Sequence, residues 1–332
     1  MDPVSHALCG AALASVGPAA DPPPRRRLAA VLGALAPDVD ALLMPVGWDR
    51  YLSVHDRGTH SLVGAVVCGV LVGVALAWRG DRAQRLGLAR AAAVGCVSHL
   101  VLDATCGGAI RPFWPVVDAV WRVPLVAMGD IVELSIFLGF ALAWWSRPRV
   151  RRRAAAVALA TVATLLFVKG GLLWRAQGAY RADLARRSSV PPVAVDAEAD
   201  WGSLTRWHVL ESTPEAHRVF AVDAARGSVT PLYAITPPQA PSVDELSQQL
   251  PVVRHALGVF AVPLVWEERD GSMRDVWWSD PHFCGPEPGA HTGRDFRCAL
   301  KFGVRFDDRS RAIAQRVVVG SFVQSRPVGT WW

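Results

Sequence analysis

The feature that most constrains the fold of this chain is an 18-residue run, residues 61–78, that contains no charged side chain. A helix of this length can cross the roughly 30 Å hydrocarbon layer of a membrane. A second run, residues 154–174, is interrupted only by Lys169. Both runs predict membrane-spanning helices. The composition of 52% hydrophobic and 19% charged residues agrees with an apolar part joined to an ordinary water-soluble part.

Four weaker apolar segments accompany these two runs, and each carries an ionisable residue. They are residues 4–20, 28–44, 86–105 and 123–145. These four segments could instead be buried helices of a water-soluble protein. Because two clear membrane spans occur in the same half of the chain, we expect the four segments to lie in the membrane as well. The sequence therefore predicts a mostly α, polytopic membrane helical bundle of about six spans over residues 1–174. A smaller α+β extracytoplasmic domain is expected over residues 175–332.

Arginine clusters fall in every second connection between the six segments. They are Arg25, Arg26 and Arg27, then Arg79, Arg82 and Arg85, then Arg147, Arg149, Arg151, Arg152 and Arg153. Because basic loops face the cytoplasm, we expect the N-terminus and the C-terminal domain to lie on the other side of the membrane. These clusters also account for the net charge of +6, so the lipid bilayer is the expected partner and nucleic acid is not.

The C-terminal half has the composition of a water-soluble domain. Six short alternating stretches predict strands, at residues 204–211, 217–223, 259–266, 274–279, 297–306 and 312–322. No catalytic motif occurs among them. If this domain lies outside the cytoplasm, Cys284 and Cys298 are able to form a disulfide that closes a short loop.

The ionisable residues of the apolar half converge on one membrane face of the predicted topology. They are His6, Asp38, Asp40, His55, His60, His99 and Asp103, with Asp130 and Glu133 after them. Ionisable side chains in a membrane are costly, and they pair with one another. Imidazoles mixed with carboxylates suit a divalent transition metal. Zinc is the first expectation and manganese or iron the alternatives, with the seven residues from His6 to Asp103 as the candidate ligands.

Spacing gives several of these residues a role. His99 and Asp103 are four positions apart, which places both side chains on one face of a helix. Pro37 discourages a regular helix just before Asp38 and Asp40. Arg57, between His55 and His60, is a candidate for holding an anionic substrate group.

Several of these residues could have a purely structural role instead. A spare carboxylate, Asp40 or Asp130, is a candidate general base, although Asp130 could instead cap the following helix. His6 could be a helix-end residue, and His99 with Asp103 could be a hydrogen-bonded structural pair.

Five short motifs occur in order in the N-terminal half. They are MDPVSHALCG at residues 1–10, APDVD at 36–40, HDRGTHS at 55–61, SHLVLD at 98–103 and PFWP at 112–115. In this order they resemble the motifs of the bacterial membrane-bound metal-dependent hydrolase family, also described as an inner-membrane-associated hydrolase family. The resemblance covers roughly residues 1–145. It implies a metal-dependent hydrolase in the bacterial inner membrane. The outer side on which the arginine topology puts the C-terminal domain would then be the periplasm.

The chain departs from the family pattern at two positions. Ser5 stands where the family often has threonine, and Asp56 separates His55 from Arg57, which are usually adjacent. The second departure concerns the role of His55 more than that of His60. The order of an early histidine, an aspartate, a histidine and a His-x-x-x-Asp pair is also similar to zinc-dependent phospholipase C and related nucleases. This fainter similarity indicates phosphoester chemistry.

The leading hypothesis is a membrane-embedded hydrolase in which one or two metal ions activate water against an ester or phosphoester. A lipid or lipid-linked substrate is expected, since it would arrive along the bilayer. The alternative is a non-catalytic membrane protein with a structural metal or polar cluster and a partner-binding outer domain. A third reading, an ion-coupled transporter, requires ionisable residues at the inner helix ends, and the sequence has no comparable ones there.

Overall fold

The computed structural model describes residues 2–16, 24–146, 148–187, 191–236, 248–286 and 296–329. The chain forms two compact units. The first comprises Met1–Leu42, Val54–Gln177 and Glu198–Trp207, and the second comprises Leu43–Ser53, Gly178–Ala197 and His208–Trp332. The domain boundary expected after residue 174 stays a prediction.

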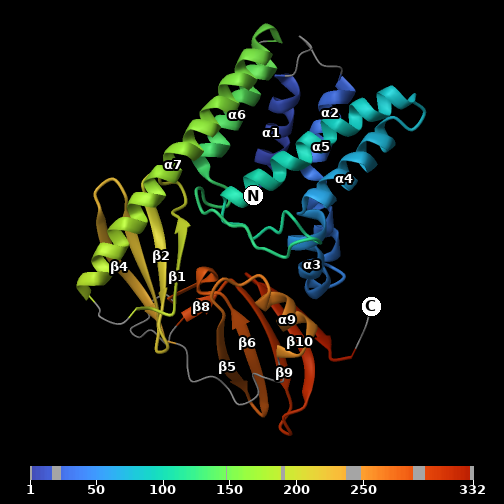
Figure 1. Cartoon of the computed structure of the whole chain (residues 1–332). Coiled ribbons are helices and arrows are strands. Elements are labelled where there is room, and N and C mark those ends of the chain that lie inside the picture. Colours follow the sequence, from blue (N-terminus) through green and yellow to red (C-terminus); the bar gives the residue numbers. More distant parts are fainter. Residues whose placement is uncertain are drawn as a thin grey trace. The chain divides into compact units, whose positions relative to one another are not determined.

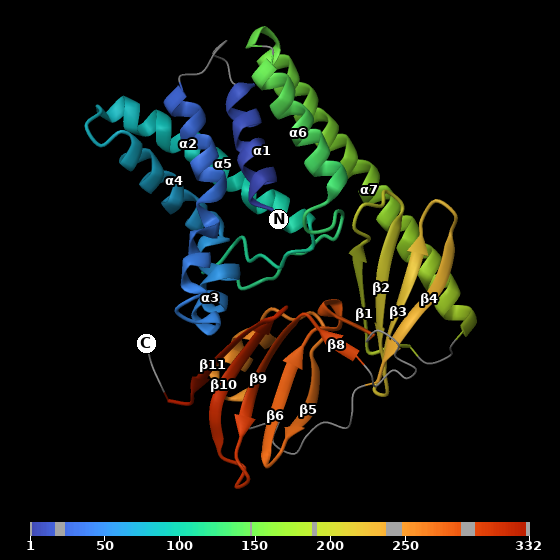
Figure 2. The same cartoon turned by 180° about the vertical axis from the view of Figure 1, so that it is seen from behind.

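The first unit is helical. Its helices are α1 (Pro3–Ser15), α2 (Pro24–Leu35), α4 (Leu62–Leu76), α5 (Arg82–Thr105), α6 (Ile131–Ser146) and the greater part of α7 (Arg151–Arg187). A 3₁₀ segment, η1 (Pro37–Leu43), follows α2, and a π-helical turn, η2 (His55–Thr59), precedes α4. In both views α1, α2 and α4 lie beside α5 (Figures 1 and 2), against which all three pack.

Three of these helices begin at a side-chain cap. The carboxylate of Asp2 accepts a hydrogen bond from the Ser5 N–H at 2.9 Å, and that of Asp81 accepts one from the Gln84 N–H at 2.7 Å. The Ser61 hydroxyl accepts from the Gly64 N–H at 3.0 Å. A cap of this kind satisfies one of the free N–H groups of the first turn. The Ser61 cap therefore sets the start of α4 directly after His60.

The expectation of about six membrane spans is wrong. Among the described residues, only α5 and α7 are long and apolar enough to cross a membrane alone, and a third span exists only if the bent pair Arg50–Thr59 and Leu62–Leu76 counts as one. The predicted spans at residues 4–20, 28–44 and 123–145 correspond to helices of 13, 12 and 16 residues. Such helices are only about 18–24 Å long at 1.5 Å per residue. The fold class is therefore a helical N-terminal part followed by a β-sheet-rich C-terminal domain.

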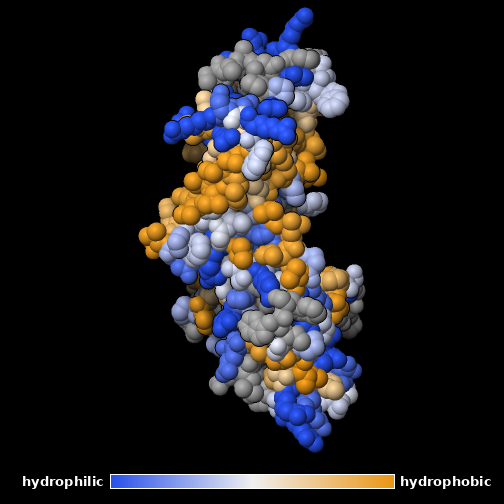
Figure 3. Space-filling model, turned by 90° about the vertical axis from the view of Figure 1, so that its right-hand side faces the viewer, coloured by the Kyte–Doolittle hydropathy of each residue, from blue (hydrophilic) through white to orange (hydrophobic). Residues whose placement is uncertain are grey.

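The hydropathy of the sequence overestimated the number of membrane spans, because it does not show where a helix begins or ends. The apolar stretch at residues 28–44 leaves the α-helix at Leu35 and continues as the 3₁₀ segment from Pro37. The stretch at residues 123–145 enters a helix only at Ile131. An apolar surface nevertheless covers the helices. Figure 3 shows hydrophobic residues gathered over the α4–α5 side, with hydrophilic residues at its upper end.

Two glycines allow α2 and α5 to touch through their backbones. A Cβ atom on Gly33 would lie 2.1 Å from the Ala92 carbonyl oxygen, and one on Gly95 would lie 2.1 Å from the Ala30 carbonyl oxygen. Both distances are far below van der Waals contact. Small residues at helix crossings permit this close approach in membrane proteins, so the two glycines set the distance between α2 and α5.

We expect Gly95→Ala to lower the free energy of unfolding by about 1–3 kcal/mol, because the added methyl group forces the two helices apart. Gly87→Ala on the same helix is the matched control, since its Cβ would meet nothing within 4 Å. This control should be neutral or stabilising by about 0.5–1 kcal/mol. Denaturant unfolding of the purified protein in detergent measures both. Equal effects of the two substitutions would rule out the tight crossing.

The second unit is built mainly of antiparallel strands. One sheet has the order β11–β10–β9–β6–β5, and its strands are β5 (Leu264–Asp270), β6 (Met273–Ser279), β9 (Leu300–Phe306), β10 (Ala312–Val319) and β11 (Phe322–Pro327). A second sheet has the order β1–β2–β3–β4, with strands β1 (Ala194–Ala199), β2 (Arg206–Ser212), β3 (His217–Asp223) and β4 (Ser228–Ile235). The strand predicted at residues 217–223 is confirmed by β3.

The disulfide expected in this domain is also present. Strands β7 (Cys284–Pro286) and β8 (Phe296–Cys298) pair with each other, and Cys284 is bonded to Cys298 across them. The sequence expectation for these two cysteines is confirmed.

A segment from the N-terminal half completes the core of the five-stranded sheet. The short helix α9 (Pro251–Leu257) packs on the sheet, and Leu52 of α3 (Trp48–Val54) is buried in the same core beside Phe302 and Val304. The ring of Trp48 lies 6.2 Å from that of Phe302. Leu43–Ser53 therefore belongs to the second unit, while the residues just before and after it belong to the first.

Candidate metal centre

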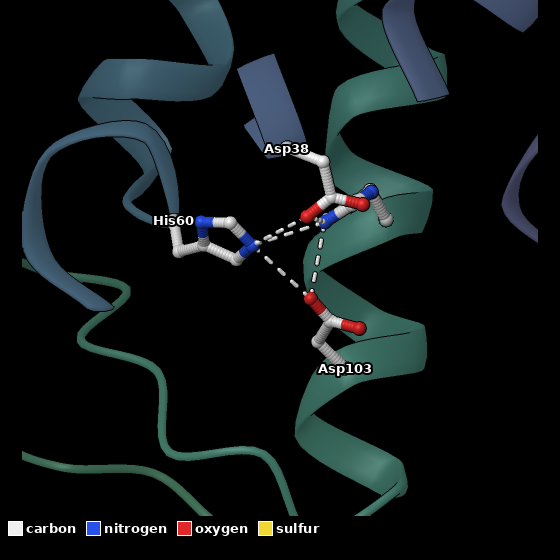
Figure 4. Close-up of side chains that lie close together, drawn as sticks. Asp38, His60 and Asp103 are labelled. Atoms are coloured by element: carbon white, nitrogen blue, oxygen red, sulfur yellow. Dashed lines mark hydrogen bonds and ion pairs between the residues drawn. The ribbon is translucent and has the colours of Figure 1, made fainter. Parts of the chain in front are cut away.

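Four side chains of the first unit bring one donor atom each to a common point. His60 Nε2, His99 Nε2, an oxygen of Asp103 and an oxygen of Asp38 all lie within 4.8 Å of one another. The Asp103 Oδ2 atom is 3.2 Å from His60 Nε2 and 3.0 Å from His99 Nε2, and the two imidazole nitrogens are 3.1 Å apart. The Asp38 Oδ1 atom is 3.6 Å from His60 and 3.5 Å from His99. Figure 4 shows the side chains of Asp38, His60 and Asp103 pointing toward one another.

These distances fit a tetrahedral metal ion. Zinc bound at about 2.0–2.1 Å by nitrogen and oxygen has neighbouring ligand atoms about 3.3–3.4 Å apart. Five of the six separations between the donor atoms run from 3.0 to 3.6 Å. The sixth, between the oxygens of Asp38 and Asp103, is at most 4.8 Å. Two carboxylates and two neutral imidazoles carry a charge of −2, which a divalent cation balances. The donor set and its spacing therefore could hold one divalent ion.

Three segments of the chain supply the four residues. His99 and Asp103 lie one turn apart on α5, as their spacing predicted. His60 lies between the π-helical turn η2 and the Ser61 cap of α4, and Asp38 lies in η1. Pro37 opens η1 just after α2, so a change from α to 3₁₀ geometry brings Asp38 to the end of α5.

The far side of each imidazole is hydrogen-bonded in a way that leaves its Nε2 atom free to bind a cation. The Nδ1 atom of His99 lies 2.7 Å from the Ala34 carbonyl oxygen, which can only accept, so the hydrogen is on Nδ1. The Thr59 hydroxyl donates to Asp40 Oδ2 at 2.5 Å and lies 3.1 Å from His60 Nδ1, from which it can accept. Such partners fix the tautomer and the direction of a metal-binding histidine.

Thr59 was missed at the level of sequence. Its hydroxyl joins Asp40 to His60, although threonine carries no charge and binds few metals. The only available signal was its position directly before a candidate ligand.

A second group contains Asp40, His55 and the Nδ1 side of His60. Asp40 Oδ2 lies 3.1 Å from His55 Nδ1 and 3.8 Å from His60 Nδ1. Because Thr59 lies between Asp40 and His60, this group supports the imidazole that faces the first group.

His6 adjoins the first group from α1. It is fully buried, its ring stacks on His99 with centroids 3.8 Å apart, and its Nε2 atom lies 3.2 Å from Asp103 Oδ1. Asp103 thus turns one oxygen toward His6 and the other toward His60 and His99. All seven residues predicted as metal ligands lie in or beside these two groups.

The other two predicted site residues belong to neither group. Asp130 accepts hydrogen bonds from the N–H groups of Val132 and Glu133 at the start of α6, and its other oxygen is 3.8 Å from Lys169 Nζ. Arg57 lies 3.8 Å from the carboxylate of Asp118. Their catalytic roles stay predictions.

The first group is buried except at Asp38. His60, His99 and Asp103 are buried, whereas the side chain of Asp38 is 31% exposed. Burial by itself raises the pKa of Asp38, but its interactions with the two histidines, above all the contact with His60, outweigh burial and leave the pKa below its usual value. Asp38 is therefore ionised at neutral pH, as a metal ligand must be. Solvent reaches the group beside Asp38.

These features together define a class: a membrane protein whose short and long helices pack around a buried His/Asp group able to hold a cation. The chain belongs to the YdjM inner membrane protein family, whose family model matches residues 1–175. An inner-membrane location follows from this membership. Comparison with curated proteins and with solved structures gave no match.

We expect the purified protein to bind one divalent ion per chain and Asp103→Asn to weaken that binding about 100-fold or more, because Asp103 contacts three imidazoles. Thr59→Val should weaken it about tenfold by releasing His60. Asp118→Asn is the control, since Asp118 pairs with Arg111. Zinc titration with elemental analysis measures all three. Equal affinities of the Asp103 and Asp118 variants would contradict the assignment.

Proposed function

We propose that this protein is a metal-dependent hydrolase of the inner membrane. The observation that carries the proposal is the meeting of His60, His99 and Asp103 at close spacing, with the partly exposed Asp38 making the longest contacts and so able to yield its position to water. The order of the five motifs supports it, since that order resembles a family of membrane-bound hydrolases.

Zinc is the proposed ion, with manganese or iron as alternatives, because nitrogen and oxygen ligands in a small tetrahedral set suit zinc best. When bound, such an ion lowers the pKa of a water molecule toward neutrality and polarises an ester or phosphoester oxygen.

The residues around the candidate metal ligands would orient the histidines, admit water and bind the substrate. Ala34 and Thr59 hold the two imidazoles in the ligating tautomer, and Asp40 holds Thr59. Asp38, the most exposed member and the one with the longest contacts, marks the side on which water and substrate enter. Arg57 would bind an anionic group of the substrate by exchanging its ion pair with Asp118.

A lipid or lipid-linked ester or phosphoester is the proposed substrate class. Two helices expose apolar side chains along their length: α4, which begins just after His60, and α5, which carries His99. These side chains include Val63, Val66 and Val101. A substrate anchored in the bilayer would reach the group along these helices, whereas a fully soluble substrate would gain nothing from them.

A panel of ester and phosphoester lipids, tested with zinc-loaded protein in detergent, examines this proposal. We expect turnover of at least one phosphoester lipid, its loss on chelation and its recovery when zinc is returned. Asp103→Asn should remove the turnover. Asp183→Asn should keep it, since Asp183 pairs with Arg186 and Arg187 of its own helix, outside the His/Asp group. Turnover that survives both chelation and Asp103→Asn would refute the assigned site.

The second candidate function is that of a non-catalytic membrane protein with a structural metal. The number of protein ligands favours this alternative. Four protein ligands are typical of structural zinc sites, whereas catalytic sites keep one position open. In that case the outer domain would bind a partner and the metal would only join α5 to η1 and α4. Chelation would then lower the thermal stability of a protein that binds zinc and hydrolyses nothing.

We further propose a multi-pass topology with the N-terminus and the C-terminal domain in the periplasm. Arg151, Arg152 and Arg153 open α7, and basic helix ends face the cytoplasm. The disulfide between Cys284 and Cys298 suits an oxidising compartment. A periplasm-dependent phosphatase reporter should be inactive when fused after residue 150 and active after residue 200. The reverse pattern would overturn this topology.

A further inference from the structure

A cavity of about 900 Å³ lies between α1, α2 and α5 in the first unit. It borders the stretch of α5 from Gln84 to Val94, whereas the His/Asp group lies at His99 and Asp103 of the same helix. Along the helix, Arg90 and His99 are about 14 Å apart. The cavity is therefore separate from the candidate metal centre, and its size is that of a site for a small organic ligand.

Three arginines line this cavity, and among the described residues none of them has an ion-pair partner. They are Arg25 and Arg26 of α2 and Arg90 of α5. Arg85 of the same helix as Arg90 differs from these three in having hydrogen-bond partners, since it donates to the carbonyl oxygens of Ala77 and Trp78. Among the described residues that line the cavity none is acidic. Guanidinium groups are well suited to phosphate, which they bind through paired hydrogen bonds.

The walls of the cavity are apolar. Leu13, Leu88 and Val94 line it beside alanine and glycine positions. Val94 is about half exposed, so the cavity is open to the outside beside this valine. A free phosphate ion would use the arginines and leave these walls unoccupied. A ligand with an anionic head and a hydrocarbon tail would use both.

We propose that this cavity binds one anionic phospholipid. Its phosphate is held by Arg25, Arg26 and Arg90, and an acyl chain lies against Leu13, Leu88 and Val94. Basic pockets between membrane helices recognise anionic lipid headgroups in this way. The proposal does not depend on the hydrolase activity or on a bound metal.

Binding of short-chain phosphatidylglycerol to the full-length protein in detergent tests the proposal, with phosphatidylcholine and inorganic phosphate as comparison ligands. We expect phosphatidylglycerol to bind at least tenfold more tightly than either. Replacing Arg25, Arg26 and Arg90 together by glutamine should weaken it about 100-fold, at roughly fivefold per arginine. The matched control replaces Arg79, Arg82 and Arg152, which lie outside the cavity lining, and should change the affinity less than twofold.

A second variant tests the apolar walls without changing charge. Gly87 lines the cavity, and a Cβ atom there would meet nothing within 4 Å. We therefore expect Gly87→Leu to fold normally and to occupy part of the cavity. We expect it to weaken phosphatidylglycerol binding at least tenfold with an unchanged melting temperature. Equal binding of phosphatidylcholine, equal effects of the two triple variants, or inorganic phosphate binding as tightly as the lipid would each overturn the proposal.

Discussion

The close crossing of α2 and α5 is the constraint on which the candidate metal centre depends. Gly33 and Gly95 let the two backbones touch. That contact brings the Ala34 carbonyl oxygen within 2.7 Å of His99 Nδ1, which turns the Nε2 atom of His99 toward Asp103. It also places the end of α2 beside α5, so that the next segment presents Asp38. A looser crossing would disturb both His99 on α5 and Asp38 in the segment that follows α2.

Part of this arrangement is visible in the sequence and part is not. The four-residue spacing of His99 and Asp103 predicts a shared helix face, and Pro37 predicts the irregular backbone that carries Asp38. Thr59 was not predictable, because a hydroxyl that bridges two side chains 20 residues apart has no local pattern. The number of spans was wrong for another reason. Hydropathy measures apolar content, whereas spanning also requires helix length, and residues 106–130 contain no α-helix.

The ligand-bearing segments are linked through a piece of chain that belongs to the other unit. Leu43–Ser53 joins the segment of Asp38 and Asp40 to that of His55 and His60, and it folds with the five-stranded sheet through Leu52. Burial of a leucine in such a core contributes on the order of 2 kcal/mol. The chain therefore passes from the segment of Asp38 to that of His60 through residues that fold with the second unit.

X-ray absorption at the metal edge of the zinc-loaded protein tests the central claim most directly, because it reports the atoms bound to the ion. We predict that the ion is bound by nitrogen and oxygen atoms only, with two imidazole rings among its ligands, and that Asp103→Asn loses the bound ion. A sulfur ligand, or a spectrum of fully hydrated zinc identical in both proteins, would contradict it.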